Sequence, residues 1–297
     1  MPFPATRLHY DLRIRLSELS SPAERYRLQL AAGNLNICPP QFQKVRKRHS
    51  CCFKIDKPSP IGVFGYRRLD ETHSEGEWWY LRDSDNTLTE CTGELSLVRF
   101  GLKDLDSDDM NRVILSPTSF SLHDCDVSIE FLQKLSKMTT PFKSLGYQRR
   151  ALGIADTLKL FPHLEALKIY KCPSTPWLAD LASAPDNNLK ELEIEGSLKE
   201  LVTFTVDEVK AYFKTLRKEF HIYLLFTNGQ RNPDYFDDPP HDETWKENDK
   251  KLKQELHDKL KEVHYREVQP PTPHITVASL GEYKRSFFLL SRKRGHT

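Results

Sequence analysis

The residues of this chain that could bind a metal ion gather near one basic segment. Zinc is held by cysteine sulfur and histidine nitrogen, and four such residues occur here: Cys38, His49, Cys51 and Cys52. Adjacent cysteines on a strand point to opposite faces, and no second pair repeats this spacing. The pattern therefore favours free thiols, and we expect no metal site.

A second group of reactive residue types is His123, Asp124 and Cys125. It lies at the end of a predicted strand, where a polar terminus explains it without catalysis. The sequence also contains no Gly-rich phosphate loop, nucleophile elbow, H-E-x-x-H or C-x-x-C motif. We therefore expect a non-enzymatic protein without a cofactor.

A basic cluster, "KVRKRHSCCFK" (44–54), offers a further possible chemistry. Residues 1–70 contain 13 Lys or Arg and 5 Asp or Glu, so this end of the chain is positively charged. Four side chains could contact the phosphates of a nucleic acid: Lys44, Arg46, Lys47 and Arg48. The run is short, so a solvated basic loop or strand edge is the favoured interpretation.

The N-terminal segment predicts two short helices. Leucines recur on one helical face, at Leu8, Leu12, Leu16 and Leu19. The sequence Ser-Pro-Ala-Glu at 21–24 then has an N-cap serine, a proline at the first helical position and a capping-box glutamate. The second helix contains Leu28 and ends before Gly33. Such a pair carries more apolar surface than it can bury internally, so it needs a partner or a neighbouring domain.

A repeat begins near residue 119. Apolar and polar residues alternate in four stretches, which are 119–125, 166–172, 191–197 and 221–227. Their starts lie 47, 25 and 30 residues apart, and the segment 142–160 could supply a missing unit. Helical patterns lie between several of them. Leucine-rich repeats have a period of about 20–29 residues, so we predict an α/β fold with a leucine-rich-repeat-like β/α array.

The sequence divides into four predicted segments. They are a helical segment (1–38), a mixed strand-rich region (39–118), the array (119–230), and a tail with linkers, an amphipathic helix at 244–265 and closing strands (231–297). The mean hydropathy is −0.60, and no apolar run approaches the roughly 20 residues that a membrane span needs. The six cysteines lack the spacing of a secreted scaffold, so we expect a cytoplasmic or nuclear protein without membrane contact.

The opening "MPFPATRLHYDLRIRLSELSSPAERYRLQL" resembles the start of nematode F-box-like proteins. The similarity rests on ten positions: Pro2, Phe3, Pro4, Leu8, Tyr10, Leu12, Leu16, Leu19, Pro22 and Arg25. Later segments, such as "LFPHLEALKIYKC", are similar to the C-terminal halves of that family. The F-box is degenerate, because His9 replaces a proline and the leucine spacing is one residue shorter.

This resemblance implies a substrate receptor of a cullin–RING ubiquitin ligase. The F-box helices would bind a Skp1-type adaptor through Leu8, Leu12, Leu16, Leu19, Pro22 and Leu28. The array would hold an unknown target protein, and strand alternation places five residues on its binding face: His123, Lys168, Tyr170, Glu193 and Glu195. Two alternatives stay open, namely a stand-alone interaction scaffold capped by its own helices and a nucleic-acid-binding protein.

Overall fold

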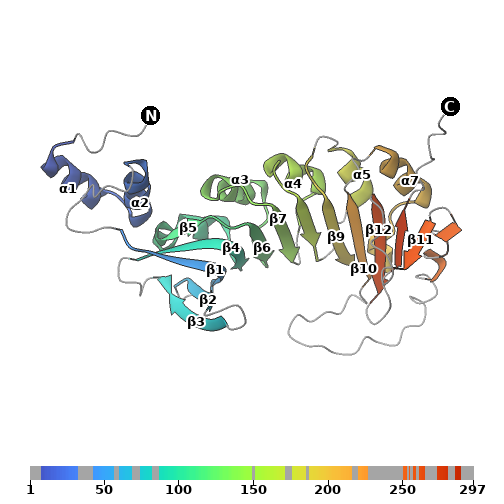
Figure 1. Cartoon of the computed structure of the whole chain (residues 1–297), viewed down its shortest axis with the longest axis horizontal. Helices are drawn as coiled ribbons and strands as arrows, with labels where there is room; N and C mark the ends of the chain where they lie inside the picture. The colour runs from blue at the N-terminus through green and yellow to red at the C-terminus, as the bar shows by residue number, and fades with distance from the viewer. Residues whose placement is uncertain are drawn as a thin grey trace. The chain divides into compact units, whose positions relative to one another are not determined.

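The fold of the chain is mixed α/β, with sheets in which parallel strand pairs predominate (Figure 1). The computed structural model describes residues 8–32, 43–56, 60–68, 74–81, 87–148, 151–170, 176–184, 187–215, 220–226, 250–252, 254, 257–258, 261–264, 273–279 and 285–288. The chain forms two compact units, Met1–Phe142 and Lys143–Thr297.

The first unit begins with the two predicted helices, α1 (Tyr10–Leu19) and α2 (Pro22–Ala31). The predicted capping box is present, because the Ser21 hydroxyl accepts the Glu24 N–H at 3.4 Å and Glu24 Oε2 accepts the Ser21 N–H at 2.8 Å. The Glu24 carboxylate accepts hydrogen bonds from the Ser21 backbone N–H and from the Ser21 hydroxyl at 2.9 Å, and these two bonds, the backbone one first, lower the pKa of Glu24. Helix α2 contacts the 3-10 helix η4 (Asp108–Arg112), whereas α1 contains no buried residue.

The sheet of the first unit has the strand order β6-β4-β1-β2-β3, and β5 pairs with β4. Strands β1, β4, β5 and β6 run parallel, and β2 and β3 continue antiparallel. Their bounds are β1 Val45–Lys54, β2 Gly62–Arg68, β3 Ser74–Tyr80, β4 Leu88–Val98, β5 Val113–Leu115 and β6 Ser119–His123. The basic segment is therefore an interior strand, so the prediction of a loop or edge was wrong.

One face of this sheet is buried. Alternate residues of its strands have almost no solvent exposure, including Phe53, Leu95, Leu97, Phe120 and Leu122. Helix α3 (Ile129–Met138) buries Phe131, Leu132 and Leu135, and it contacts the 3-10 helix η3 (Leu102–Asp106). This helix follows β6, where a helical pattern between predicted strands was expected, and Ser128 is its N-cap.

The second unit contains five parallel strands in the order β7-β8-β9-β10-β12, followed by antiparallel β13 and β11. Their bounds are β7 Ser144–Gln148, β8 Ala166–Ile169, β9 Glu191–Gly196, β10 His221–Phe226, β11 Lys261–His264, β12 His274–Ser279 and β13 Arg285–Phe288. Strands β6 to β10 begin at residues 119, 144, 166, 191 and 221, so β7 supplies the unit that was predicted to be missing.

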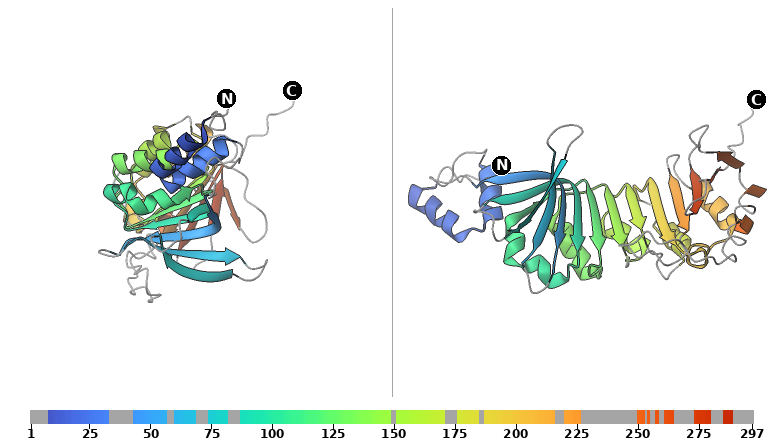
Figure 2. Two further views of the ribbon diagram at one scale, coloured as in Figure 1. Left: turned by 90° about the vertical axis from the view of Figure 1, so that its left-hand side faces the viewer. Right: turned by 90° about the horizontal axis from the view of Figure 1, so that it is seen from below.

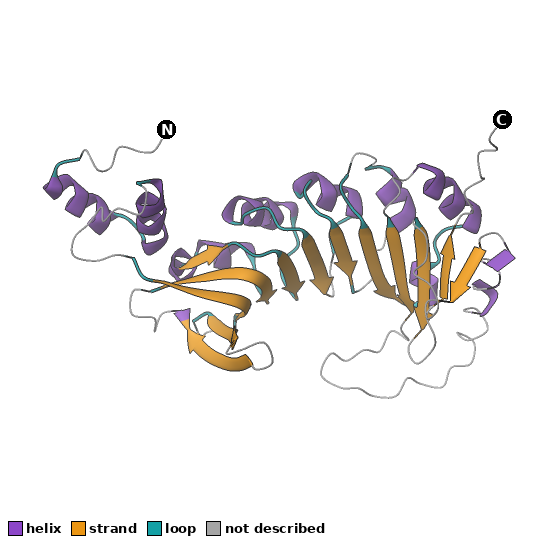
Figure 3. Cartoon of the chain, in the orientation of Figure 1, coloured by secondary structure: helices purple, strands orange, loops and turns teal. Residues whose placement is uncertain are grey.

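A repeated pattern builds the core of the second unit. Leu164, Leu167 and Ile169 are buried around β8, and three residues with the same spacing are buried around β9, namely Leu189, Leu192 and Ile194. The helices of this unit lie on one side of its strands (Figures 2 and 3). They are α4 Ile154–Leu160, α5 Trp177–Ala182, α6 Leu198–Leu201 and α7 Val206–Thr215. The opposite face of the sheet therefore carries no described helix.

The helix predicted at 244–265 is wrong at its C-terminal end. Residues 250–252 are helical, but Lys261–His264 form β11 and pair with β13. Val263 fits the apolar stripe of a helix, yet the backbone of this segment completes the edge of the sheet. The stretch 244–249 and the proline-rich segment 232–240 lie outside the described residues.

An interhelical cap gives a first testable prediction. The Asp180 carboxylate of α5 accepts the backbone N–H of Ile154, the first residue of α4, at 2.6 Å. We expect Asp180→Ala to lower the free energy of unfolding by about 1–2 kcal/mol, as loss of a helix cap does. The control Asp156→Ala removes only an exposed pair with Lys159 and should change it by less than about 0.5 kcal/mol. Urea unfolding measures both, and equal effects would contradict the capping role.

Candidate functional site

The helix pair α1–α2 exposes large apolar side chains. The exposed fraction is 58% for Leu12 and 71% for Leu19 on α1, and 49% for Leu30 on α2. Tyr10, at the start of α1, is 45% exposed. Leu12 and Leu19 are two helical turns apart, so they share one face. An apolar stripe of this kind is typical of a helix that docks into a partner.

The six predicted adaptor-binding residues differ in their exposure. Leu12 and Leu19 are exposed, whereas the other four, Leu8, Leu16, Pro22 and Leu28, are half-buried. Tyr10 and Leu30 were not in the predicted set. The amphipathic pattern of each helix could have predicted their exposure, because neither residue lies on the buried side of its helix.

The open face of the second sheet forms the second part of the candidate site. Register places Lys168 of β8, Glu193 of β9, Tyr223 of β10 and Thr276 of β12 in one row across four strands. Four of the five residues predicted for a partner-binding face lie here, in or directly after β8 and β9: Lys168, Tyr170, Glu193 and Glu195. Glu195 is only 4% exposed, so its prediction as a partner-binding residue is wrong, because the end of β9 is buried at both faces. His123, the fifth, ends β6 in the first unit.

Lys168 is held between two carboxylates of the neighbouring strand. Its ammonium lies 3.1 Å from Glu193 Oε2 and 3.7 Å from Glu191 Oε1. Burial is the largest single influence and lowers the pKa of Lys168, but the hydrogen bond and charges of the two glutamates outweigh it, so the pKa is raised. This lysine therefore stays charged and fixes both carboxylates on the open face.

Toward β12 this face is buried, because His274 is 6% exposed and Thr276 is 1% exposed, whereas His221 of β10 is half-buried. The rings of His221 and His274 stack with their centres 4.0 Å apart, and His221 Nε2 lies 3.0 Å from Thr276 Oγ1. The Tyr223 ring meets His221 edge-on at 6.1 Å. None of these residues was predicted to belong to the site. The alternation in "HIYLLFT" was a usable signal, because it places His221 and Tyr223 on the face opposite Ile222.

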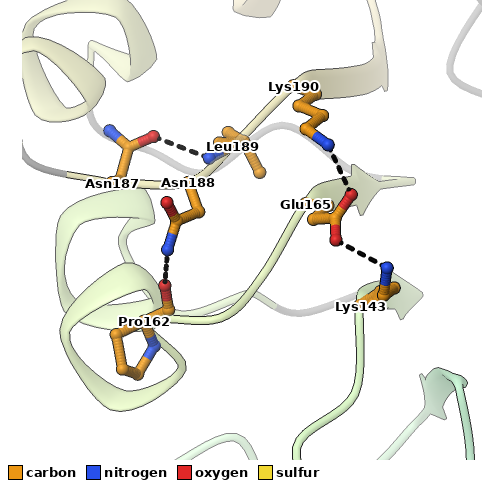
Figure 4. A network of polar contacts seen from close by, with 7 residues as sticks. All are labelled: Lys143, Pro162, Glu165, Asn187, Asn188, Leu189 and Lys190. Carbon is orange, nitrogen blue, oxygen red and sulfur yellow. Dashed lines mark hydrogen bonds and ion pairs between the residues drawn. The ribbon is translucent and has the colours of Figure 1, made fainter.

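Ion pairs also link the residues that precede successive strands of the second unit (Figure 4). The Glu165 carboxylate lies 2.8 Å from Lys190 Nζ and 2.9 Å from Lys143 Nζ. Asn188 Nδ2 donates to the Pro162 carbonyl at 2.9 Å, which joins the turn before β9 to the turn before β8. Similar contacts thus repeat from one β/α unit to the next.

The ion pairs of Glu165 predict a lowered pKa for its carboxyl group. Hydrogen bonds from Lys190 and then Lys143 lower the pKa of Glu165 to about 2. In Lys143→Met/Lys190→Met, we expect the pKa of Glu165 to return toward its ordinary value. NMR titration of the side-chain carboxyl carbon measures this change. An unchanged pKa in the double variant would contradict the assignment of its cause.

The sign of the accompanying stability effect follows from the direction of the shift. A lowered folded-state pKa stabilises the protein above the ordinary glutamate pKa, and this contribution is lost as the pH falls through the folded value. Because the Glu165 side chain is partly exposed to solvent, the effect should weaken as salt is added.

The predicted nucleic-acid residues already have acidic neighbours. Lys47 Nζ lies 3.4 Å from Glu90 Oε2, and Arg48 Nη2 lies 2.7 Å from Glu77 Oε2. The other two, Lys44 and Arg46, are exposed. These pairs reduce the positive charge that the strand presents, and nucleic-acid binding stays a prediction.

The thiols of the basic strand point in different directions. Cys51 is buried and Cys52 is half-buried, as expected for neighbours on a strand. A hydrogen bond with Cys91, followed by burial, raises the pKa of Cys51. Cys38 lies outside the described residues. Within the described ranges, no three His, Cys, Asp or Glu residues are grouped to hold a metal ion.

Comparison of the chain with protein-family models, curated proteins and solved structures gave no match. Among the residues that the structure describes, no helix has the length and apolar character needed to cross a membrane.

Proposed function

We propose that this chain is a non-enzymatic receptor subunit of a cullin–RING ubiquitin ligase. Helices α1 and α2 act as a degenerate F-box that binds a Skp1-type adaptor. The β/α units of the second half act as a leucine-rich-repeat-like array that holds a target protein. The observation that carries the proposal is the exposed apolar surface of α1, on which Leu12 and Leu19 lie open to solvent.

The strand spacing supports the second part of the proposal. Strands β6 to β9 begin 25, 22 and 25 residues apart, which is within the usual period of leucine-rich repeats. Each parallel strand of such an array buries one face against helices, and the other face is available for a partner. In the second unit the half-buried part of that face is formed by Lys168, Glu193 and Tyr223.

The exposure of the leucines on α1 bears on the alternative that the chain is a stand-alone scaffold. If α1 capped the protein's own array, its leucines would be buried against the rest of the chain. The exposure of Leu12 and Leu19 favours an external partner instead. Within the described residues, α2 contacts η4 and so attaches the helix pair to the first unit.

The proposal is tested with the full chain and a purified Skp1-type adaptor. We expect a 1:1 complex on size-exclusion chromatography with multi-angle light scattering. The adaptor together with an established F-box protein is the positive control. If the chain and adaptor elute separately at concentrations where the control complex forms, the receptor function is refuted.

A further inference from the structure

Two buried N–H groups on the first sheet lack a hydrogen-bond acceptor. The Arg48 side chain is 10% exposed, and its Nε atom has no acceptor among the described residues. Nε1 of Trp79 is buried and lacks an acceptor in the same way. The guanidinium carbon of Arg48 lies 5.5 Å from the centre of the Trp79 ring, so the donors belong to neighbouring groups. Buried donors are normally satisfied, which makes this pair unusual.

The surrounding strands fix both side chains. Arg48 Nη2 donates to Glu77 Oε2 at 2.7 Å, which leaves Nε–H as a separate donor. The Trp79 ring lies against Gly65, where a Cβ atom would come within 2.7 Å of Cη2. Only glycine at this position lets the indole lie so close to β2. The two donors are therefore held in place before any ligand arrives.

The local charge favours an anionic acceptor. Lys44 and Arg46 lie at alternate positions before Arg48 and share its face of β1, where Glu77 is the carboxylate that pairs with Arg48. Lys47 and its partner Glu90 lie on the opposite face. A positive balance remains among these described side chains. A neutral carbonyl would only accept the hydrogen bonds, whereas a negatively charged oxyanion accepts them and is also attracted by the positive side chains.

We infer that Arg48 and Trp79 form a binding site for an oxyanion, either a phosphate or a carboxylate group. Arg48 supplies its Nε–H and its positive charge, and Trp79 supplies its indole N–H. Arginine commonly binds carboxylate and phosphate groups, and the indole N–H of tryptophan is a hydrogen-bond donor without acceptor capacity. The site lies within β1 and β3 of the first unit and does not depend on the proposed ligase function.

The indole N–H of Trp79 gives a direct readout. The chain has four tryptophans, so a ¹⁵N-labelled sample gives at most four indole cross-peaks, and Trp79→Phe identifies one of them. We expect that peak to shift saturably when either sodium phosphate or sodium acetate is added. Sodium chloride at the same ionic strength is the reference. The anion that saturates the shift identifies the ligand class.

Matched variants separate a site from diffuse attraction. Arg48→Gln should weaken binding about tenfold or more, because it removes both the charge and the Nε–H donor. The control Arg46→Gln makes the same exchange at an exposed residue of β1 and should change the affinity by less than about threefold. Equal losses in the two variants would overturn the site.

Two further outcomes decide the inference. Absence of a saturable shift with both anions would overturn it and would mean that solvent satisfies the donors. Where Arg48→Gln does not fold, Trp79→Phe decides, because it keeps a ring over Gly65 and removes only the donor. Calorimetry should then show weaker binding of the active anion to Trp79→Phe, and unchanged binding would refute the site.

Discussion

The double variant Leu12→Asp/Leu19→Asp should remain folded and lose about 100-fold or more in affinity for a Skp1-type adaptor. Both side chains are exposed on one face of α1, so burying a carboxylate at either position in an interface is costly. Interface anchors typically contribute about 2 kcal/mol or more, and each 1.4 kcal/mol corresponds to about tenfold in affinity. Surface plasmon resonance with immobilised adaptor measures the loss.

The control for this variant is Ile129→Asp. Ile129 is 44% exposed at the start of α3, outside the helix pair, and the substitution makes a similar apolar-to-acidic change. It should leave adaptor binding within about twofold. Thermal unfolding should show that all variants keep the parent's stability within about 0.5 kcal/mol, as for most surface positions. A double variant that unfolds would show instead that these leucines stabilise the protein's own fold.

Trp177→Ala should have the largest effect on stability, lowering the free energy of unfolding by about 3–5 kcal/mol. Trp177 is fully buried in α5, its Nε1–H donates to the Leu201 carbonyl at 2.8 Å, and its ring meets Phe204 edge-on at 5.3 Å. The substitution removes apolar packing and leaves a buried carbonyl without its donor. Urea unfolding followed by circular dichroism measures the loss.

Two comparisons separate the contributions of Trp177. Trp177→Phe keeps most of the ring volume and loses the hydrogen bond, so it should cost about 1–3 kcal/mol. Trp78→Ala removes the same side chain from a 61% exposed position and should cost no more than about 1 kcal/mol. Equal losses at positions 78 and 177 would contradict the described core of the second unit.

Local signals in the sequence predicted most of the elements correctly. The capping box at 21–24 specifies the start of α2 through contacts within one helical turn. Alternation identified β6, β8, β9 and β10 because one face of each strand is buried. Strand β7 was only a possible unit, since Gly146 replaces a polar residue at the centre of its alternation.

The predictions that were wrong concern segments whose structure depends on contacts with residues distant in the sequence. The segment 261–264 continues a helical pattern, but pairing with β13 makes it a strand. The basic run 44–54 was predicted to be a loop or an edge strand. It is instead an interior strand between β2 and β4, and its residues Cys51 and Phe53 are buried in the core. Likewise, the contact of Arg48 with Trp79 joins residues of two strands, and neither residue alone indicates the other.

Only part of the open face of the second sheet was predicted, because the rest of it depends on contacts between strands that are distant in the sequence. Alternation within β8 and β9 placed Lys168 and Glu193 on one side, and the register confirms that they are neighbours. His274 lies next to His221 only because β12 pairs with β10, which is distant from it in the sequence. The sequence does not encode that pairing locally.

Hydrogen–deuterium exchange of the full chain, alone and with saturating adaptor, will show whether α1 and α2 bind a Skp1-type adaptor. We expect peptides covering residues 8–32 to become protected, because the helix pair is buried in the complex, and we expect no change in the strands of the second unit. Unchanged exchange over 8–32, or protection confined to other segments, would refute adaptor binding by the helix pair.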